Sequence, residues 1–159
     1  MVKIIRADLR NKTQARAFME LMRAYAMDRM GGGRDLPDYA KANLAPALSD
    51  RDDVHVVLAY VDSEAAGLVT CIEGFSTFAC KPLLNIHDAV VKPEFRGRGI
   101  ARMLFREVEA IAREQGCCKL TLEVLEGNTV AMAAYSSLGF SAYQLDPGLG
   151  KALFWEKKL

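Results

Sequence analysis

A glycine-rich stretch follows a run of apolar residues in the second half of the sequence. It reads Val90-Val91-Lys92-Pro93-Glu94-Phe95-Arg96-Gly97-Arg98-Gly99-Ile100-Ala101. This pattern predicts the end of a strand, a loop and the first turn of a helix. Backbone N–H groups at a helix N-terminus bind anions, and glycines let a phosphate approach the backbone closely. With charge-assisted hydrogen bonds from Arg96 and Arg98, the stretch predicts a site for a ligand that carries a pyrophosphate.

Two common phosphate-binding motifs do not match this loop. The dinucleotide fingerprint G-x-G-x-x-G needs a third glycine, but Arg102 stands at that position after Gly97 and Gly99. A Walker loop needs Gly-Lys followed by Ser or Thr, and the sequence contains no such triplet. ATP and NAD are therefore disfavoured as ligands. A plain glycine-capped turn into an ordinary helix stays open as the alternative.

Strands and helices are needed to position this loop. β-Forming residues predict strands at 2–6, 55–61, 66–75, 83–91, 120–124, 140–144 and 152–156. Apolar residues at helical spacing predict helices at 13–30, 35–49, 100–115 and 128–138. The resulting order, β-α-α-β-β-β-α-β-α-β-β, predicts an α/β fold with a mixed sheet in one domain that covers residues 1–159.

Composition excludes several classes of protein. Lys and Arg number 21 and Asp and Glu 20, a net charge of +1, so no basic surface for nucleic acid is expected. No apolar run approaches the roughly 18 residues of a membrane-spanning helix. Charged residues near the N-terminus leave no room for a secretory leader, so a cytoplasmic location is expected.

The cysteines do not indicate a metal site or a disulfide framework. No C-x-x-C pair occurs, and no metal-ligand spacing joins the cysteines to His55 or His87. We therefore expect reduced thiols, mostly buried as small apolar residues, and no bound metal. The four positions are Cys71, Cys80, Cys117 and Cys118.

Two separate motifs resemble one known family. The pattern Arg96-x-x-Gly99-x-Ala101 resembles the acyl-CoA pyrophosphate loop of the GNAT superfamily of N-acetyltransferases. In the second signature of the superfamily, an Asn opens a helix, a Tyr follows two turns later and Gly-Phe ends the helix. This signature is similar to Asn128, Tyr135 and Leu138-Gly139-Phe140. The predicted order of elements is also that of the superfamily. The resemblance therefore implies a mostly antiparallel mixed sheet with helices on both faces.

The resemblance also implies how acetyl-CoA would bind. The pantetheine arm would lie along the strand that ends in Ala89, Val90 and Val91, and the pyrophosphate would contact the N–H groups of residues 96–101. Asn128 would contact the cofactor arm, although it also suits a plain helix cap. The cofactor-binding residues expected are Ala89, Val90, Val91, Arg96, Gly97, Arg98, Gly99, Ile100, Ala101, Asn128 and Tyr135.

Tyr135 matches the general acid of the superfamily, which protonates the departing thiolate of CoA. A phenol of pKa about 10 can donate to a thiolate whose acid has a pKa of about 8.5 if the proton moves as the bond breaks. The alternative is that Tyr135 packs in the core with its hydroxyl hydrogen-bonded.

A base is also needed, because an alkyl amine of pKa about 10.4 is protonated at neutral pH. Several relatives carry an acidic pair where this sequence has His87 and Asp88, and an imidazole is a competent base near neutral pH. Alternation along a strand predicts that His87 and Asp88 face opposite sides of the sheet, so only one of them would face the site. Alternatively, His87 is a structural residue and a chain of waters removes the proton.

The resemblance assigns the acceptor pocket to the first two helices, their connection and later strands. Candidate substrate-binding residues are Tyr25, Asp35, Tyr39 and Glu73, with Asp38 beside them. The carboxylates could attract a cationic amine, or they could belong to a solvated face.

These expectations predict an N-acetyltransferase that moves an acetyl group from acetyl-CoA to a primary amine of a small molecule or a peptide. The amine would attack the thioester directly in a ternary complex. The alternative is a non-catalytic acyl-CoA-binding sensor or regulatory module, against which the presence of Tyr135 weighs. The last predicted strand, with Phe154 and Trp155, could form the edge of a homodimer or belong to the core.

Overall fold

The computed structural model describes all residues from 1 to 159. The chain forms two compact parts, residues 1–122 and residues 123–159, and each is described by itself. None of the helices has both the length and the apolar character that crossing a bilayer requires.

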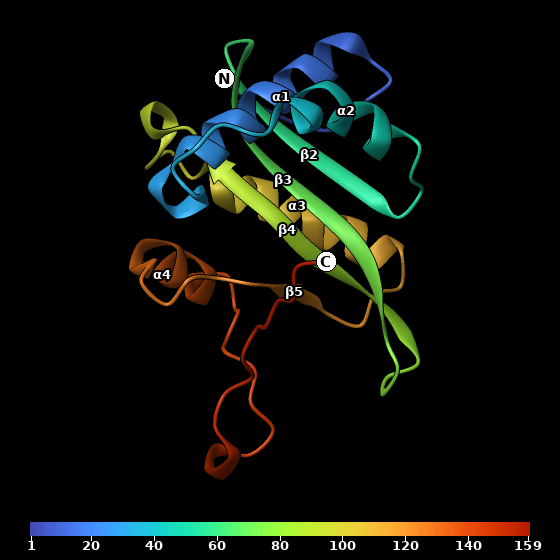
Figure 1. The fold of residues 1–159 in the computed structure, drawn as a ribbon, viewed down its shortest axis with the longest axis vertical. Coiled ribbons are helices and arrows are strands. Elements are labelled where there is room, and N and C mark those ends of the chain that lie inside the picture. Colours follow the sequence, from blue (N-terminus) through green and yellow to red (C-terminus); the bar gives the residue numbers. More distant parts are fainter. The chain divides into compact units, whose positions relative to one another are not determined.

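The first part contains a five-stranded sheet in the order β1-β2-β3-β4-β5 (Figure 1). Each of the first four strands pairs antiparallel with the next, and β5 pairs parallel with β4. This confirms the predicted mixed, mostly antiparallel sheet. The strands are β1 (Val2–Arg6), β2 (Val54–Val61), β3 (Glu64–Ser76), β4 (Lys81–Val91) and β5 (Leu120–Leu122).

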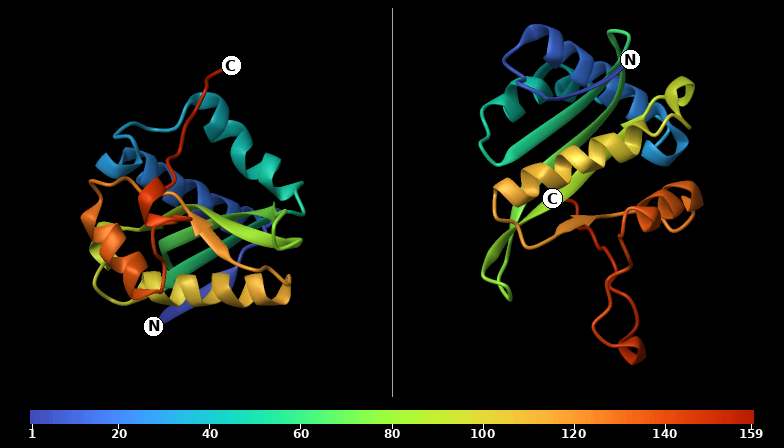
Figure 2. Two further views of the ribbon diagram at one scale, coloured as in Figure 1. Left: turned by 90° about the horizontal axis from the view of Figure 1, so that it is seen from below. Right: turned by 180° about the vertical axis from the view of Figure 1, so that it is seen from behind.

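Three helices of the first part cover both faces of the sheet. Helices α1 (Lys12–Met27) and α2 (Asp38–Ser49) lie on one face, and α3 (Ile100–Glu114) lies on the other (Figure 2). Helix α1 begins where the Asn11 side chain accepts hydrogen bonds from the N–H groups of Thr13 and Gln14. It ends earlier than the sequence pattern predicts, because the Asp28 side chain accepts from the Met30 N–H and starts the 3₁₀ turn η1 (Arg29–Gly31).

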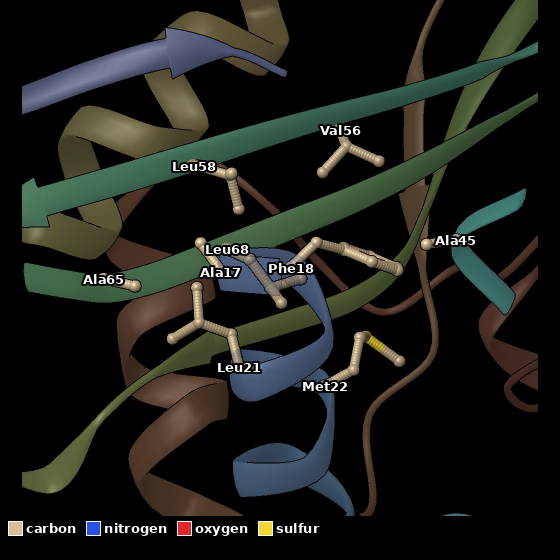
Figure 3. Close-up of a cluster of buried hydrophobic side chains, with 9 residues drawn as sticks. All are labelled: Ala17, Phe18, Leu21, Met22, Ala45, Val56, Leu58, Ala65 and Leu68. Atoms are coloured by element: carbon tan, nitrogen blue, oxygen red, sulfur yellow. The ribbon is translucent and has the colours of Figure 1, made fainter. Parts of the chain in front are cut away.

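A cluster of buried apolar side chains forms most of the core between the sheet and the first two helices. Phe18 and Leu21 of α1 are fully buried against Leu58 of β2 and Leu68 of β3 (Figure 3). Fully burying a side chain of this size contributes about 1.5–3 kcal/mol. The whole cluster comprises Ala17, Phe18, Leu21, Met22, Ala45, Val56, Leu58, Ala65 and Leu68.

The opposite face of the sheet packs against α3. This helix buries Ile100, Leu104, Val108 and Ile111, which recur at the spacing of one helix face. Gly67 on β3 faces this helix, since a side chain added there would lie 3.3 Å from Leu104 Cδ1. Odd-numbered residues of β3 from Gly67 to Glu73 therefore face α3, and even-numbered residues from Leu68 to Ile72 face α1 and α2.

The second part, residues 123–159, contains α4 (Thr129–Ser137) and the 3₁₀ turn η3 (Pro147–Leu149). The two final strands predicted at 140–144 and 152–156 are absent, and this prediction was wrong. One backbone hydrogen bond, from Ala152 N to Tyr143 O at 3.1 Å, joins the two segments. An isolated pair of strands is only marginally stable, so alternating residues alone do not make a strand there.

Candidate functional site

The C-terminal half of β4 has one unpaired edge. Strand β5 pairs with β4 only at Leu84, Asn85 and Ile86, whereas β3 pairs with β4 as far as Val91. From His87 to Val91, β4 therefore has a sheet partner on one side only. An edge of this kind presents free N–H and C=O groups to an extended ligand. Ala89, Val90 and Val91, predicted to contact the cofactor arm, lie along this edge.

A β-bulge interrupts β4 where the paired and unpaired regions meet. Cys71 of β3 lies opposite Ile86 and Thr70 lies opposite Asp88, so His87 is an extra residue without a partner across the strands. Asn85 and Asp88 consequently lie on the same face of the sheet, although three positions separate them. His87 Nδ1 lies 3.4 Å from Asn85 Oδ1, which places its ring on that face too.

This bulge corrects the prediction that His87 and Asp88 face opposite sides of the sheet. Regular alternation holds only while every residue has one partner, and the extra residue shifts the alternation by one. Both side chains therefore face α1 and α2. His87 is exposed, and Asp88 is partly buried.

The environment of Asp88 is unusual for a carboxyl group. Burial raises the pKa of Asp88, while the neighbouring His87 and the Thr70 hydroxyl oppose this rise. Tyr25 of α1 is half-buried near the same carboxyl group, and its pKa is raised by burial and then by the charges of Asp88 and Asp28. A carboxylate whose pKa is raised is a stronger base than an ordinary carboxylate, which suits it to accept a proton.

Cys71 lies next to this group but on the α3 side of the strand. Burial, and then the negative charge of Asp88, raise the pKa of Cys71 to about 12. A fully buried thiol with a raised pKa is poorly suited to act as a nucleophile.

The loop before α3 has the features of an anion site. The first backbone hydrogen bond at the start of the helix runs from Met103 N to Gly99 O, so residues 97–102 have N–H groups without backbone partners. Gly97 and Gly99 have φ angles of +76° and +74°, which other residues rarely adopt. No side chain caps the helix at Gly99, so its N-terminus is open to a phosphate group.

The two arginines of the loop make internal contacts. Arg96 Nε donates to Val91 O at 3.0 Å, and Arg96 Nη2 donates to Asp28 Oδ2 at 3.1 Å. The guanidinium of Arg98 lies 5.4 Å from the centre of the Phe95 ring. In this structure Arg96 holds the loop against β4 and the end of α1. The loop groups left without a partner in the protein are therefore its backbone N–H groups. The sequence did not indicate this use of Arg96 or the role of Asp28.

The predicted acceptor residues do not form one cluster. Tyr25 lies near Asp88, as described above. Asp35 is bound by Arg23 Nη2 at 2.7 Å, and its pKa is lowered to about 2, mainly by that hydrogen bond. Tyr39, on the first turn of α2, is 81% exposed.

Glu73 lies on the other side of the sheet from these three residues. Its Oε1 atom is 2.7 Å from His55 Nε2. Both side chains lie on the face of the sheet that packs against α3. Glu73 therefore cannot join Tyr25, Asp35 and Tyr39 in one pocket on the α1 side. The sequence alone did not predict on which face of the sheet Glu73 lies, because no motif in it indicated the register of β3.

In the second part of the chain, Asn128 opens α4 as predicted. Its Oδ1 atom accepts a hydrogen bond from the Ala131 N–H at 3.2 Å. Tyr135 lies on the same helix, and its ring meets that of Phe140 edge to face with 6.1 Å between centroids. The Phe140 N–H donates to the Tyr135 carbonyl, which fixes the turn after the helix. The motif is therefore one compact local unit.

Comparison with known proteins decides the family. A family profile described as the acetyltransferase (GNAT) family matches residues 15–140. The chain belongs to this family. The match spans both the loop before α3 and the Asn128–Phe140 motif, so this GNAT protein carries the two regions that suggested the resemblance.

Sequence relatives of this GNAT chain include two named acetyltransferases. A streptothricin acetyltransferase of Streptomyces lavendulae is 36% identical over 118 residues, which cover 74% of this chain and 57% of the relative. A thialysine N-epsilon-acetyltransferase of Caenorhabditis elegans is 31% identical over 87 residues, which cover 55% of this chain and 54% of the relative. The matches thus span just over half of each relative.

Solved structures confirm the GNAT fold. An aminoglycoside acetyltransferase from an uncultured soil metagenomic sample, in complex with sisomicin, has a TM-score of 0.79 at 18% identity, with 99% of this chain and 96% of that chain covered. AAC(6')-Iy, in complex with the bisubstrate analog CoA-S-monomethyl-acetylneamine, has a TM-score of 0.78 at 21% identity, with 100% of this chain and 99% of that chain covered. At sequence identities of 18% and 21%, these structures show that the fold is shared and nothing more.

Proposed function

We propose that this protein is an N-acetyltransferase that moves an acetyl group from acetyl-CoA to a primary amine of a small molecule or a peptide. One observation carries the proposal: the unpaired edge of β4 leads directly into the open, glycine-capped N-terminus of α3. An extended arm can pair with the first, and a pyrophosphate can bind the second. Acetyl-CoA has both groups and supplies the activated acetyl group.

The residues of the first part divide the work of binding. N–H groups of residues 97–102 hold the pyrophosphate, and Arg96 keeps the loop in place through Val91 and Asp28. Backbone N–H groups near Val90 and Val91 polarise the thioester oxygen. The N-terminal dipole of α3 adds to the attraction for the phosphates.

His87 and Asp88 prepare the amine, since both face the α1 side of β4. Asp88, partly buried, accepts a proton from the ammonium group directly or through water. The exposed His87 assists at the same face. Tyr135, within the Asn128–Phe140 unit, protonates the departing thiolate.

The acceptor class rests on the relatives. Thialysine, streptothricin and aminoglycosides, which appear in the names of relatives and structural neighbours, all contain primary amines. We therefore propose an amine acceptor of this small cationic kind, with Tyr25 and Tyr39 as contact residues from the first two helices.

Amine-dependent release of CoA from acetyl-CoA tests this function. Chromatography should follow CoA, because the exposed native cysteines Cys80 and Cys118 would react with a thiol dye. The panel should include thialysine, lysine, a streptothricin, an aminoglycoside, a polyamine and a lysine peptide. Turnover with one class above background hydrolysis supports the proposal. Tight binding of acetyl-CoA without turnover would favour a sensor, and absence of binding would overturn the assignment of the α3 loop.

The predicted homodimer is a separate part of the proposal. Phe154 and Trp155 are 78% and 83% exposed, and they lie in the C-terminal segment that forms no strand. Light scattering of the wild type and of a Phe154→Ser/Trp155→Ser variant would test it. A dimer that the variant loses supports pairing through this segment, and a monomeric wild type contradicts it.

A further inference from the structure

Thr70 is a polar residue among the apolar side chains buried on the sheet. It is the one buried polar residue, at 2% exposure, and its neighbours along β3 on the same face are Leu68 and Ile72. Its Oγ1 atom is shielded from solvent and has no hydrogen-bond partner of ordinary geometry. A buried hydroxyl without a partner lowers stability, because it loses its hydrogen bonds to water and gains none in the protein. A valine of the same shape would avoid this cost, so the hydroxyl calls for another reason.

The position of Thr70 supplies that reason. It lies directly opposite Asp88 across β3 and β4, immediately before the bulge that His87 creates. Residues opposite each other in antiparallel strands have Cβ atoms about 4.5–5.5 Å apart. The bulge is what brings Asp88 onto this face; without it, the residue after Ile86 would lie opposite Thr70. Thr70 is thus the polar residue directly opposite Asp88 across the two strands.

We propose that Thr70 is a positioning residue, whose hydroxyl donates a hydrogen bond to the ionised Asp88 carboxylate and so holds that group ready to accept a proton from the acceptor amine. The role of Asp88 in accepting a proton rests on the proposed function, whereas the hydrogen bond from Thr70 to Asp88 does not depend on it. The hydroxyl donates to the charged carboxylate, so it stabilises the ionised form over the protonated form.

Other groups near Asp88 act in both directions. His87, on the same strand, favours the ionised carboxylate, and so does the Thr70 hydroxyl, whereas burial opposes it. On α1, Tyr25 faces Asp88 and also feels the charge of Asp28 at the end of that helix. Cys71, on the adjacent position of β3, feels the charge of Asp88 from the other face. Removal of the hydroxyl alone should therefore raise the pKa of Asp88 further.

A carboxyl ¹³C NMR titration measures this directly and does not require enzymatic turnover. The proteins are the wild type, Thr70→Val, which removes the hydroxyl at constant shape, and Thr70→Ser, which restores a hydroxyl. Asp88→Asn identifies the Asp88 resonance. We expect the Asp88 midpoint to rise by about one pH unit in Thr70→Val and to return toward the wild-type value in Thr70→Ser. Equal midpoints in all three proteins would overturn the proposal.

Kinetics add a second readout if the protein acetylates an amine. The acid limb of kcat/KM against pH should move to higher pH in Thr70→Val and return in Thr70→Ser, while the affinity for acetyl-CoA stays unchanged. A loss of rate at every pH without displacement of the limb would show a merely structural role and would contradict the proposal. If Thr70→Val does not fold, Thr70→Ala replaces it in the same titration. Absence of turnover in the wild type would reject the proposed function, and the NMR result would still decide the contact.

Discussion

Asp28 and Arg96 stand 68 positions apart and form an ion pair, with Asp28 Oδ2 3.1 Å from Arg96 Nη2. The other carboxylate oxygen, Asp28 Oδ1, accepts from the Met30 N–H and shapes the turn after α1. These two contacts, the backbone N–H first, lower the pKa of Asp28. One carboxylate thus connects the segment between the first two helices with the loop before α3.

Replacement of Arg96 by lysine should weaken the binding of acetyl-CoA about ten-fold. A lysine has no fork of donors and cannot reach Val91 O and Asp28 together, so the loop loses its support. Arg51→Lys is the control, because Arg51 pairs with Asp53 in an exposed turn away from the loop. Calorimetric titration with acetyl-CoA measures both variants. Unchanged affinity in Arg96→Lys would show that the backbone holds the loop without this side chain.

Gly99→Ala should reduce both stability and affinity for acetyl-CoA. Gly99 has a φ of +74° with no heavy atom within 4 Å of an added Cβ, so the effect is backbone strain of about 1 kcal/mol. Gly116→Ala is a matched control, since Gly116 has a φ of +70° and the same open surroundings. Thermal unfolding should show a similar loss in both variants, but acetyl-CoA binding should fall only in Gly99→Ala. An equal loss of binding in Gly116→Ala would argue against a special role for the α3 N-terminus.

Tyr135→Phe should lower kcat about 100-fold and leave the affinity for acetyl-CoA within two-fold, which is about the rate effect expected for loss of a general acid. The ring contact with Phe140 needs no hydroxyl, so α4 should stay folded. Tyr143→Phe removes a hydroxyl from the same part of the chain and serves as the control. Full turnover by Tyr135→Phe would remove the general-acid assignment.

Asp88→Asn should stabilise the fold while it lowers activity. Because burial raises the pKa of Asp88, the native state holds this proton more tightly than the unfolded chain does. Its contribution to stability is therefore present below the unfolded pKa of about 3.9 and is lost as pH rises through the folded pKa. The neutral amide avoids that loss.

The gain in Tm for Asp88→Asn over wild type should therefore be near zero at pH 4 and grow steadily toward pH 8. Scanning calorimetry across this range measures it. A gain that is largest at low pH would mean that the carboxyl group is stabilised as an anion.

Local sequence signals predicted much of the fold. The α3 stripe of Ile100, Leu104, Val108 and Ile111 has a spacing that only one helix face provides. Asn11 and Asn128 cap the helices that follow them, because a side-chain oxygen next to the free N–H groups satisfies them locally. By contrast, the segments 140–144 and 152–156 alternate like strands but lack a sheet of their own to join. Strand formation depends on a partner that local sequence does not contain.

The sequence by itself determined the glycine-rich loop before α3, the Asn128–Phe140 unit and the family, because each depends on residues close together in the chain. Only the tertiary structure decided which side chains share a face. The bulge at His87 turns Asp88 toward Thr70, and the register of β3 turns Glu73 toward His55 on the opposite face. One extra residue in a strand reverses the alternation of all that follow, and pairing with the neighbouring strand, rather than the residue type, fixes where that happens.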